Sequence, residues 1–490
     1  MRGGIYTFRP HVVLRYVGLI VLVTAFFMFM SLVVALVYND SGRIPLLFSM
    51  LITTLVGVFP FVFVKAEPSI SSREGYAIVV FSWLAACFFG MIPYVLWGGE
   101  FNLSAAWFES VSGFTTTGAT ILDDVEALPP SLLLWRSFTH LFGGMGVVVF
   151  TLVVLPGMGS AQMTLSRNEV SSLSRNDFKY RSKKMLRVMA TTYLSIIVFL
   201  TAGLVWVKIP TFDAVNLAMS TVATGGFAVK NLSIAAYNNP TAEWILTLGM
   251  FVSSLHFGLL FGLFTGFFTG RWRAVFRSPI VRLFTGVVLG ATFLIFLSLT
   301  LQYGMGGLEA LRKAAFQVTT IVSTTGLAAG ESLGWPIFTS LILILLSFSG
   351  GCSGSTAGGM KIDRIAIIGA TVRSVFLKQR HPQAVIPIHV GSLHIENQIA
   401  QNAIIYFVLH LSLILLAMVY FSLSFDSLEE SFTTALTMIS NIGPAVGTLS
   451  SFASYSFLSH LGRVISTLLM LLGRLEIFGL LLIFFPSSWK

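Results

Sequence analysis

Thr116-Thr117-Gly118-Ala119 is the first of four short, similar segments in this chain of 490 residues. The other three are Ala223-Thr224-Gly225-Gly226, Thr324-Thr325-Gly326-Leu327 and Asn441-Ile442-Gly443-Pro444. They recur at nearly equal spacing, and each lies between two long apolar stretches. Self-similarity at a fixed period indicates a repeated structural unit. These glycine segments therefore predict a fold built from four copies of one unit.

A short stretch typical of an amphipathic helix precedes each glycine segment. The stretches are Ser104–Ser112, Asp213–Thr221, Glu309–Ile321 and Ser427–Ile439. They are too short to cross a bilayer, which takes about 20 residues. A helix that ends at the glycine segment would point its partially negative C-terminus at the bilayer centre, where it favours a cation. Four such loops around an axis could surround a cation with backbone carbonyls that replace its water shell.

The alternative is that the four segments are ordinary glycine-rich loops between helices. Glycine supplies backbone angles that other residues resist, and it lets carbonyls approach an axis closely. Non-helical backbone inside a membrane is tolerated only where it lines water or protein. Because four copies occur, each followed by a new apolar stretch, the sequence favours the pore.

The composition requires a membrane. Apolar residues make up 55% of the chain and charged residues only 10%, unlike soluble domains. Ten stretches have about the length that crosses a bilayer. They are 15–38, 45–65, 76–98, 132–155, 185–208, 242–269, 282–302, 336–370, 398–424 and 460–485. We therefore expect an all-α polytopic membrane protein surrounded by lipid.

The charges are distributed unevenly along the chain, which carries a formal net charge of +10. Most Lys and Arg lie near the start, in 167–187, in 271–282, in 361–380 and at Lys490, whereas many acids lie in the alternate loops. This is the positive-inside pattern of membrane proteins. It predicts cytoplasmic termini and external glycine segments. It also explains the positive charge without nucleic-acid binding.

The spans and glycine segments together predict the organisation of the chain. We expect two leading transmembrane helices in 1–70, followed by four pseudo-repeats of helix, pore loop and helix around a central ion pore. The repeats would occupy 71–160, 161–270, 271–381 and 382–490.

The third repeat contains an unusual glycine-rich run, residues 350–359. It reads Gly350-Gly351-Cys352-Ser353-Gly354-Ser355-Thr356-Ala357-Gly358-Gly359. So many glycines and hydroxyls cannot sustain a rigid helix, so the run should interrupt the span just below the third glycine segment. A polar loop there could block the pathway and move aside, and we interpret it as a gate. The alternative is a loop that only lets helices pack closely.

Arg474 lies within the last apolar span. A charge at such depth is expensive and usually faces a cavity or a partner. We expect Arg474 below the glycine segments, donating to carbonyls of the 350–359 loop and opposing cation passage. The alternative is an ion pair with Glu476 or with a buried acid such as Glu109.

Other chemistry has less support. His256 could suggest a proton relay, but a packed or hydrogen-bonding histidine is the favoured interpretation. Cys87 and Cys352 fall in apolar or membrane segments, which indicates neither a disulfide framework nor a metal site. No nucleophile motif or phosphate-binding loop is present. A membrane-embedded enzyme or a solute permease would need a cluster of polar residues, so we expect a transporter and not an enzyme.

The motifs resemble those of the TrkH/TrkG branch of the Trk/Ktr/HKT superfamily of cation transporters. The resemblance is carried by 112–120, 221–227, 322–326, 440–444 and 350–364. It covers essentially the whole chain from about residue 70. The two leading spans resemble the additional N-terminal pair of TrkH.

The resemblance implies potassium uptake across the bacterial inner membrane, with K+ as the transported ion and no organic cofactor. It also implies a homodimer with one pore per subunit, and a cytoplasmic ring of TrkA-like, nucleotide-binding subunits that controls the gate. The basic loops 167–187, 271–282 and 373–381 would be docking surfaces for that ring. The alternatives are a symporter that couples K+ to H+ or Na+, and a less selective monovalent cation transporter.

The resemblance also implies which residues form the K+ filter and the gate. The filter residues would be Thr116, Thr117, Gly118, Ala223, Thr224, Gly225, Thr324, Thr325, Gly326, Asn441, Ile442 and Gly443. Glycine at all four central positions implies a preference for K+. The fourth copy departs most, because Asn441 and Ile442 replace the threonine pair. The 350–359 loop and Arg474 would form the gate.

Overall fold

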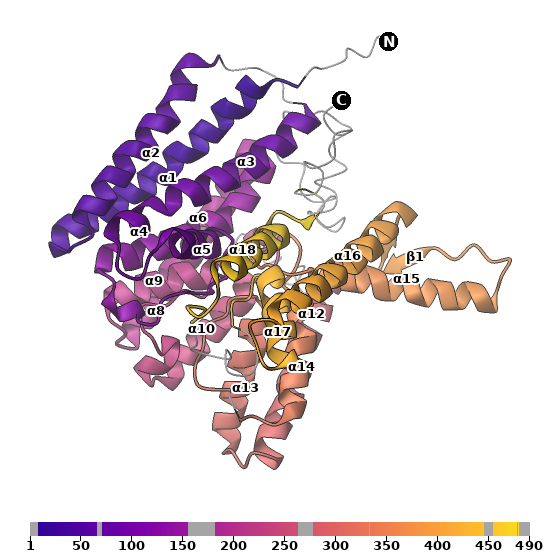
Figure 1. Ribbon diagram of the computed structural model, residues 1–490. Helices are drawn as coiled ribbons and strands as arrows, with labels where there is room; N and C mark the ends of the chain where they lie inside the picture. Colours follow the sequence, from indigo (N-terminus) through magenta and orange to yellow (C-terminus); the bar gives the residue numbers. More distant parts are fainter. Residues whose placement is uncertain are drawn as a thin grey trace, which may run out of the picture.

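The computed structural model describes residues 8–65, 71–154, 182–262, 278–332, 334–444, 454–477 and 479. Its helices pack side by side, and the two leading helices lie along one flank (Figure 1). The framework helices are α1 (Pro10–Tyr38), α2 (Arg43–Phe63), α3 (Ser72–Gly90), α4 (Ile92–Trp97), α6 (Pro130–Val154), α8 (Ser182–Trp206), α10 (Pro240–Ser253), α12 (Pro279–Leu301), α14 (Ile337–Ser347), α15 (Ile362–Arg380), α16 (Asn397–Phe421) and α18 (His460–Arg474).

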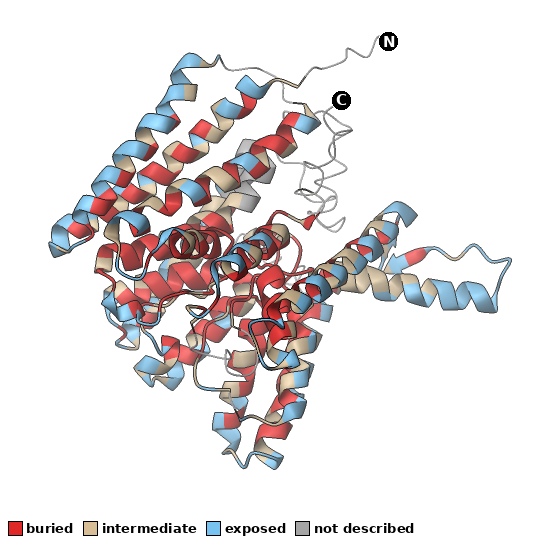
Figure 2. Cartoon of the chain, viewed as in Figure 1, coloured by how far each residue is buried: buried red, intermediate tan, exposed pale blue. Residues whose placement is uncertain are grey.

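The described helices fit a multi-pass membrane protein. Six of them are long and apolar enough to cross a bilayer: α1, α2, the continuous segment Arg73–Trp97, the Met189–Trp206 part of α8, α12 and α16. Large apolar side chains such as Leu55, Leu301 and Leu416 are exposed on their outer faces. Figure 2 shows many exposed residues along α1, α2 and α16, away from the buried centre. Apolar faces of this extent are stable against lipid rather than water.

Four short helices lie between the framework helices. They are α5 (Leu103–Phe114), α9 (Thr211–Val222), α13 (Gly307–Val322) and α17 (Leu428–Ser440). All four overlap the short stretches expected from the sequence, which are confirmed as helices. The last two turns of each are buried. The α5 N-terminus is capped by Asn102, whose side chain accepts from the backbone amide of Ala105 at 3.0 Å.

Several expected spans are broken, and tertiary contacts explain two of the breaks. The span 242–269 was expected to be continuous, but α10 ends at Ser253. The Ser254 carbonyl accepts from the backbone amide of Cys352 at 2.9 Å, and the Phe257 amide donates to Gly354. The 350–359 loop thus pairs with the backbone of this broken segment. The same loop separates α14 from α15 within the expected span 336–370.

Other boundaries also differ from the sequence expectation. The span 76–98 is divided into α3 and α4 at Met91, next to Pro93. In the span 460–485, α18 ends at Arg474, and most later residues lie outside the described part. Among the described residues, the short structures are a hairpin of β1 (Ile388–Val390) and β2 (Leu393–Ile395), and the 3-10 helices η1 (Val125–Ala127) and η4 (Ser233–Tyr237).

Candidate ion pathway

Each short helix ends in the same backbone turn. One residue adopts the left-handed conformation, with φ of 53° at Thr116, 54° at Thr224, 56° at Thr324 and 54° at Asn441. The following residue donates its amide to a carbonyl five residues earlier, at 2.9 Å in all four copies, which caps the helix. A left-handed β-branched residue costs about 1–3 kcal/mol and usually marks a functional constraint. Three threonines carry this cost at equivalent places.

The turns correct the register of the second copy. Two residues after the left-handed residue, a glycine has a positive φ in every repeat: Gly118, Gly226, Gly326 and Gly443. The sequence expectation placed Gly225 at this position and Ala223 among the filter residues. In the structure, Ala223 is still the α-conformation cap of α9, and Thr224 is the left-handed residue. Two adjacent glycines made the sequence alignment ambiguous. The four turns are therefore 116–118, 224–226, 324–326 and 441–443.

The four turns meet in a closed ring. A Cβ atom added at Gly118 would lie 2.0 Å from the carbonyl oxygen of Gly225. The same relation continues around the ring. An added Cβ would lie 2.1 Å from the Thr325 carbonyl oxygen at Gly226, 2.1 Å from that of Ile442 at Gly326 and 2.5 Å from that of Thr117 at Gly443. Each glycine thus makes room for a carbonyl of the next repeat. This pseudo-fourfold arrangement brings together all four segments that the sequence singled out.

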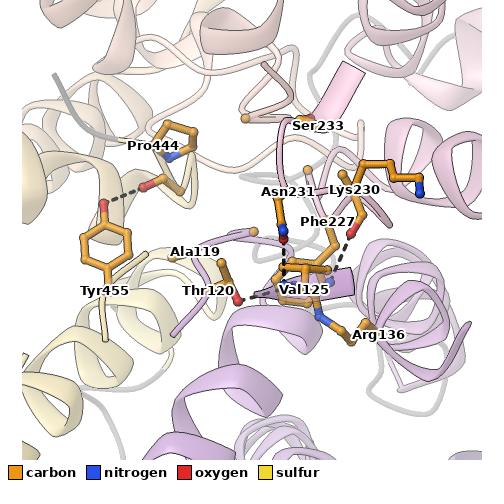
Figure 3. A pocket seen from close by; sticks show the side chains of 15 residues that line it. Ala119, Thr120, Val125, Arg136, Phe227, Lys230, Asn231, Ser233, Pro444 and Tyr455 are labelled. Carbon is orange, nitrogen blue, oxygen red and sulfur yellow. Dashed lines mark hydrogen bonds between the residues drawn. The ribbon is translucent and has the colours of Figure 1, made fainter. Parts of the chain in front are cut away.

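A small pocket of about 70 Å³ opens onto one face of this ring. It is lined by Gly118, Ala119, Thr120, Val125, Arg136, Gly226, Phe227, Ala228, Lys230, Asn231, Ser233, Gly326, Gly443, Pro444 and Tyr455. Figure 3 shows side chains of several repeats around it. The Tyr455 hydroxyl donates to the Gly443 carbonyl at 2.7 Å and so fixes the fourth turn. We call this space the mouth pocket.

A buried ion pair supports the first two turns. Arg136 of α6 donates to Glu109 of α5 at 2.9 Å, and both side chains are almost fully buried. Its guanidinium also donates to the Ala228 carbonyl at 3.1 Å and lies 4.0 Å from the centre of the Phe227 ring. Repeat 1 thereby holds the chain that follows turn 224–226. Sequence reasoning missed this pair, although an ionisable residue in an apolar span was the signal for it.

Charged groups beside the mouth pocket are paired with each other. Lys230 Nζ lies 2.9 Å from Glu126 Oε2, and the Asn231 side chain donates to Asp124 at 2.8 Å. The sequence indicated external acids here but did not identify Lys230. The available signal was a lysine soon after the second glycine segment, because the chain that follows turn 224–226 lines the pocket.

The 350–359 loop lies on the other side of the ring. It contacts residues before the turns or at their first position, whereas the mouth pocket is lined by the last glycine of each turn and by residues that follow. The Gly358 amide donates to Thr324 Oγ1 at 2.7 Å, and Thr356 Oγ1 donates to the Val222 carbonyl at 2.9 Å. The Ser353 amide donates to the buried carboxylate of Asp363 at 2.6 Å. Nearly all of the loop is buried against the residues that lead into the ring.

Arg474 connects the last repeat to this loop. Its guanidinium donates to the carbonyls of Thr356 at 2.7 Å and Gly143 at 3.0 Å. The two acids considered as alternative partners are engaged elsewhere, since Glu109 pairs with Arg136 and Glu476 pairs with Arg364. Arg474 is only 6% exposed, so its charge lies inside the protein beneath the ring.

The remaining candidates are structural. His256 is buried, its Nδ1 accepts from the Gly258 amide at 2.9 Å, and its ring lies against Gly354 of the loop. Cys87 and Cys352 are both free and buried. Within the described residues, no group of His, Cys, Asp and Glu could hold a metal ion in the manner of a resident metal site.

Comparisons with known proteins agree with this architecture. A profile of the TrkH family, described as cation transport protein, matches residues 45–490. The chain is 30% identical to the Trk system potassium uptake protein TrkH of Halomonas elongata over 98% of this chain and 99% of that protein. It is 29% identical to the Trk system potassium uptake protein TrkG of Escherichia coli K12, over 99% of this chain and 99% of that protein.

The fold also matches a solved structure. The crystal structure of the potassium transporter TrkH from Vibrio parahaemolyticus superposes with a TM-score of 0.89 at 25% identity, covering 99% of this chain and all of that one. Since the family match extends over most of the sequence and the fold agrees throughout, the family is established. The chain belongs to the TrkH family of cation transport proteins, which are transporters and not enzymes.

Proposed function

We propose that this protein takes up K+ through the ring of four turns, which acts as its selectivity filter. The observation that carries the proposal is the ring itself, in which four equivalent glycines each adjoin a carbonyl of the next repeat. The partially negative ends of four short helices meet there, and they favour a cation. Backbone carbonyls at such a site can replace the hydration shell of K+.

The relatives support the choice of ion. Those compared above are described as potassium uptake proteins of a Trk system. We extend this to uptake across the bacterial inner membrane, with both termini in the cytoplasm and a homodimer as the working assembly. A cytoplasmic, nucleotide-binding ring of TrkA-like subunits would regulate it. The first two of its proposed docking loops, 167–187 and 271–282, lie largely outside the described residues.

The gate of this proposed pathway consists of the 350–359 loop and Arg474. The loop occupies the space beneath the ring, and Arg474 holds the Thr356 carbonyl there. A positive charge at this depth opposes the passage of a cation. Release of the loop from Arg474 would therefore open the pathway.

The experiment is ⁸⁶Rb+ uptake by potassium-depleted cells that lack their own potassium uptake systems and express the full chain. We expect uptake that K+ inhibits and Na+ does not. In Gly118→Ser, the new Cβ would meet the Gly225 carbonyl, so the ratio of Rb+ to Na+ flux should fall by about tenfold, or 1.4 kcal/mol.

Gly98→Ser is the matched control. Gly98 has a φ of 81°, close to the 78° of Gly118, but nothing lies within 4 Å of its added Cβ. Both variants therefore place serine at a positive φ, which L-residues resist, and only Gly118→Ser also disturbs the ring. Equal loss of selectivity in the two variants, or absence of Rb+ uptake by the wild type, would contradict the proposal.

A further inference from the structure

Asn441 is the residue at which the fourth turn differs from the other three. It adopts the left-handed conformation with a φ of 54°, where the other repeats have threonine. Asparagine accepts this conformation more readily than a β-branched residue. Its side chain is fully buried, so its contacts, and not only its backbone, distinguish repeat 4.

The Asn441 amide joins three parts of the molecule. Its Nδ2 donates to Thr117 Oγ1 of the first turn at 3.0 Å and to the Met470 carbonyl of α18 at 2.9 Å. A backbone carbonyl can only accept, so this contact fixes which side-chain atom is the nitrogen. Met470 lies one helical turn before Arg474 on α18. A single side chain thus connects the ring to the helix that bears Arg474.

The equivalent threonines make different contacts. Thr224 Oγ1 donates to its neighbour's carbonyl at 2.6 Å, and Thr324 Oγ1 accepts from Gly358 of the loop. Thr116 Oγ1 has no hydrogen-bond partner among the residues that the structure describes. None of these hydrogen bonds reaches the framework helix that follows the turn, as the Asn441 hydrogen bond does in repeat 4.

The surrounding packing leaves little room for independent movement. A Cβ atom added at Gly473 would lie 1.9 Å from the Ile439 carbonyl and 2.7 Å from Asn441 Oδ1. A Cβ atom at Gly358 of the loop would lie 2.8 Å from Asn441 Cβ. Helix α18 and the 350–359 loop therefore lie directly against Asn441. A displacement of α18 must move Asn441 or break its hydrogen bonds.

We propose that Asn441 is a positioning residue. It couples the location of α18, and hence of Arg474, to the hydrogen-bonded contact between the fourth and first turns. The inference rests on the proposed function of the ring as a filter. Movement of Arg474 away from the loop carries the Met470 carbonyl with it, and the Asn441 amide transmits this movement to Thr117. Movement of the gate thereby changes the filter at one contact of the pseudo-fourfold ring, between the fourth and first turns.

The first test is Asn441→Thr, which gives repeat 4 the residue of the other three repeats. Threonine accepts this backbone conformation in those repeats, but its hydroxyl is too short to replace both amide contacts. We expect the ratio of Rb+ to Na+ flux in the cell assay to fall by about tenfold. An unchanged ratio in a variant that expresses and folds like the wild type would overturn the inference.

A double-mutant cycle isolates the contact between the two turns. Thr117→Val removes the acceptor of the Asn441 amide, and Thr325→Val is its matched control. Both hydroxyls bond a hydroxyl two residues earlier, at 2.8 Å in repeat 1 and 2.7 Å in repeat 3, but only Thr117 also bonds Asn441. The effects of Asn441→Thr and Thr117→Val on the flux ratio should be non-additive by about threefold to tenfold, as for one net hydrogen bond. The pair with Thr325→Val should be additive.

A second readout separates failure of this inference from failure of the proposed function. We expect K+ to raise the Tm of the purified wild-type chain more than Na+ does, because a bound ion stabilises the folded state. Asn441→Thr should lose this K+ preference, whereas Gly98→Ser should keep it. Additive cycles with a K+-selective wild type would overturn only the role of Asn441. A wild type with neither Rb+ uptake nor a K+-dependent Tm would overturn the filter as well.

Discussion

Lys230 brings a positive charge to the mouth pocket, where a cation pathway would disfavour it. Glu126 compensates that charge through the 2.9 Å contact to Lys230 Nζ. The hydrogen bond from Lys230, followed by that from the Asn231 amide, lowers the pKa of Glu126 below its ordinary value. Glu126 therefore remains ionised at neutral pH, and the compensation is lost only as the pH falls through this lowered pKa.

Removal of this compensation should slow cation uptake. In Glu126→Gln, the unpaired Lys230 would repel cations, and we expect Rb+ uptake at low ionic strength to fall by about twofold to threefold. The effect should shrink at high salt because both groups are partly exposed. Glu309→Gln removes the same charge from another Lys-paired glutamate, outside the mouth-pocket lining, and is the control. A similar decrease in both variants would assign the effect to overall charge.

At the scale of elements, Arg474 joins α18 to the 350–359 loop. Three residues hold the loop by hydrogen bonds: Thr324 of the third turn, Asp363 of α15 and Arg474 of α18. Charge-assisted hydrogen bonds such as that of Arg474 are stronger than neutral ones. The two carbonyls bound by Arg474 belong to different repeats, so its planar guanidinium is well suited to bridge them.

Truncation of Arg474 should therefore increase cation flux. We expect Arg474→Ala to raise Rb+ uptake by about tenfold, equivalent to 1.4 kcal/mol. Arg474→Lys should give a smaller increase, because lysine keeps the charge but lacks the rigid fork. Arg463→Ala removes a guanidinium from the opposite end of α18 and serves as the control. Unchanged flux in a well-folded Arg474→Ala protein would remove Arg474 from the gate.

At the scale of the whole molecule, ion pairs connect successive repeats. Glu109 and Arg136 both belong to repeat 1, and Arg136 also donates to the Ala228 carbonyl, which follows turn 224–226 of repeat 2. Glu243 of α10 pairs with Arg312 of α13 at 2.9 Å and joins repeat 2 to repeat 3. The first pair is the more deeply buried. It should therefore contribute more to stability than the second when one partner is removed.

Breaking the buried pair should destabilise the whole fold. Glu109→Gln leaves Arg136 buried without its counter-charge, which costs about 3–5 kcal/mol. We expect a large decrease in the Tm of the purified protein, and a smaller decrease for Glu243→Gln. Joint replacement of Glu109 and Arg136 by apolar residues of similar volume should cost less than Glu109→Gln alone. Equal Tm values for Glu109→Gln and the wild type would contradict this role of the pair.

Features that depend on neighbouring residues could be predicted from the sequence. Apolar runs specify the membrane helices, and the short amphipathic stretches specify α5, α9, α13 and α17. The glycines of 350–359 predicted the break between α14 and α15. These features follow from hydrophobicity and backbone preference, which act over a few turns of chain. The all-α membrane fold was therefore predictable without contacts.

Which distant groups meet could not be predicted from the sequence, because it depends on tertiary packing. The tertiary structure placed Gly226 rather than Gly225 at the positive-φ position of the second turn, because the end of α9 at Ala223 sets the turn. It ended α10 where the 350–359 loop pairs with Ser254, and it gave Arg474 carbonyl partners in place of the two acids. Each outcome depends on backbone groups that are far apart in sequence. Backbone carbonyls and amides are chemically alike in every residue, so the sequence does not indicate which of them pair. The choice of partner is therefore fixed by how the four repeats pack.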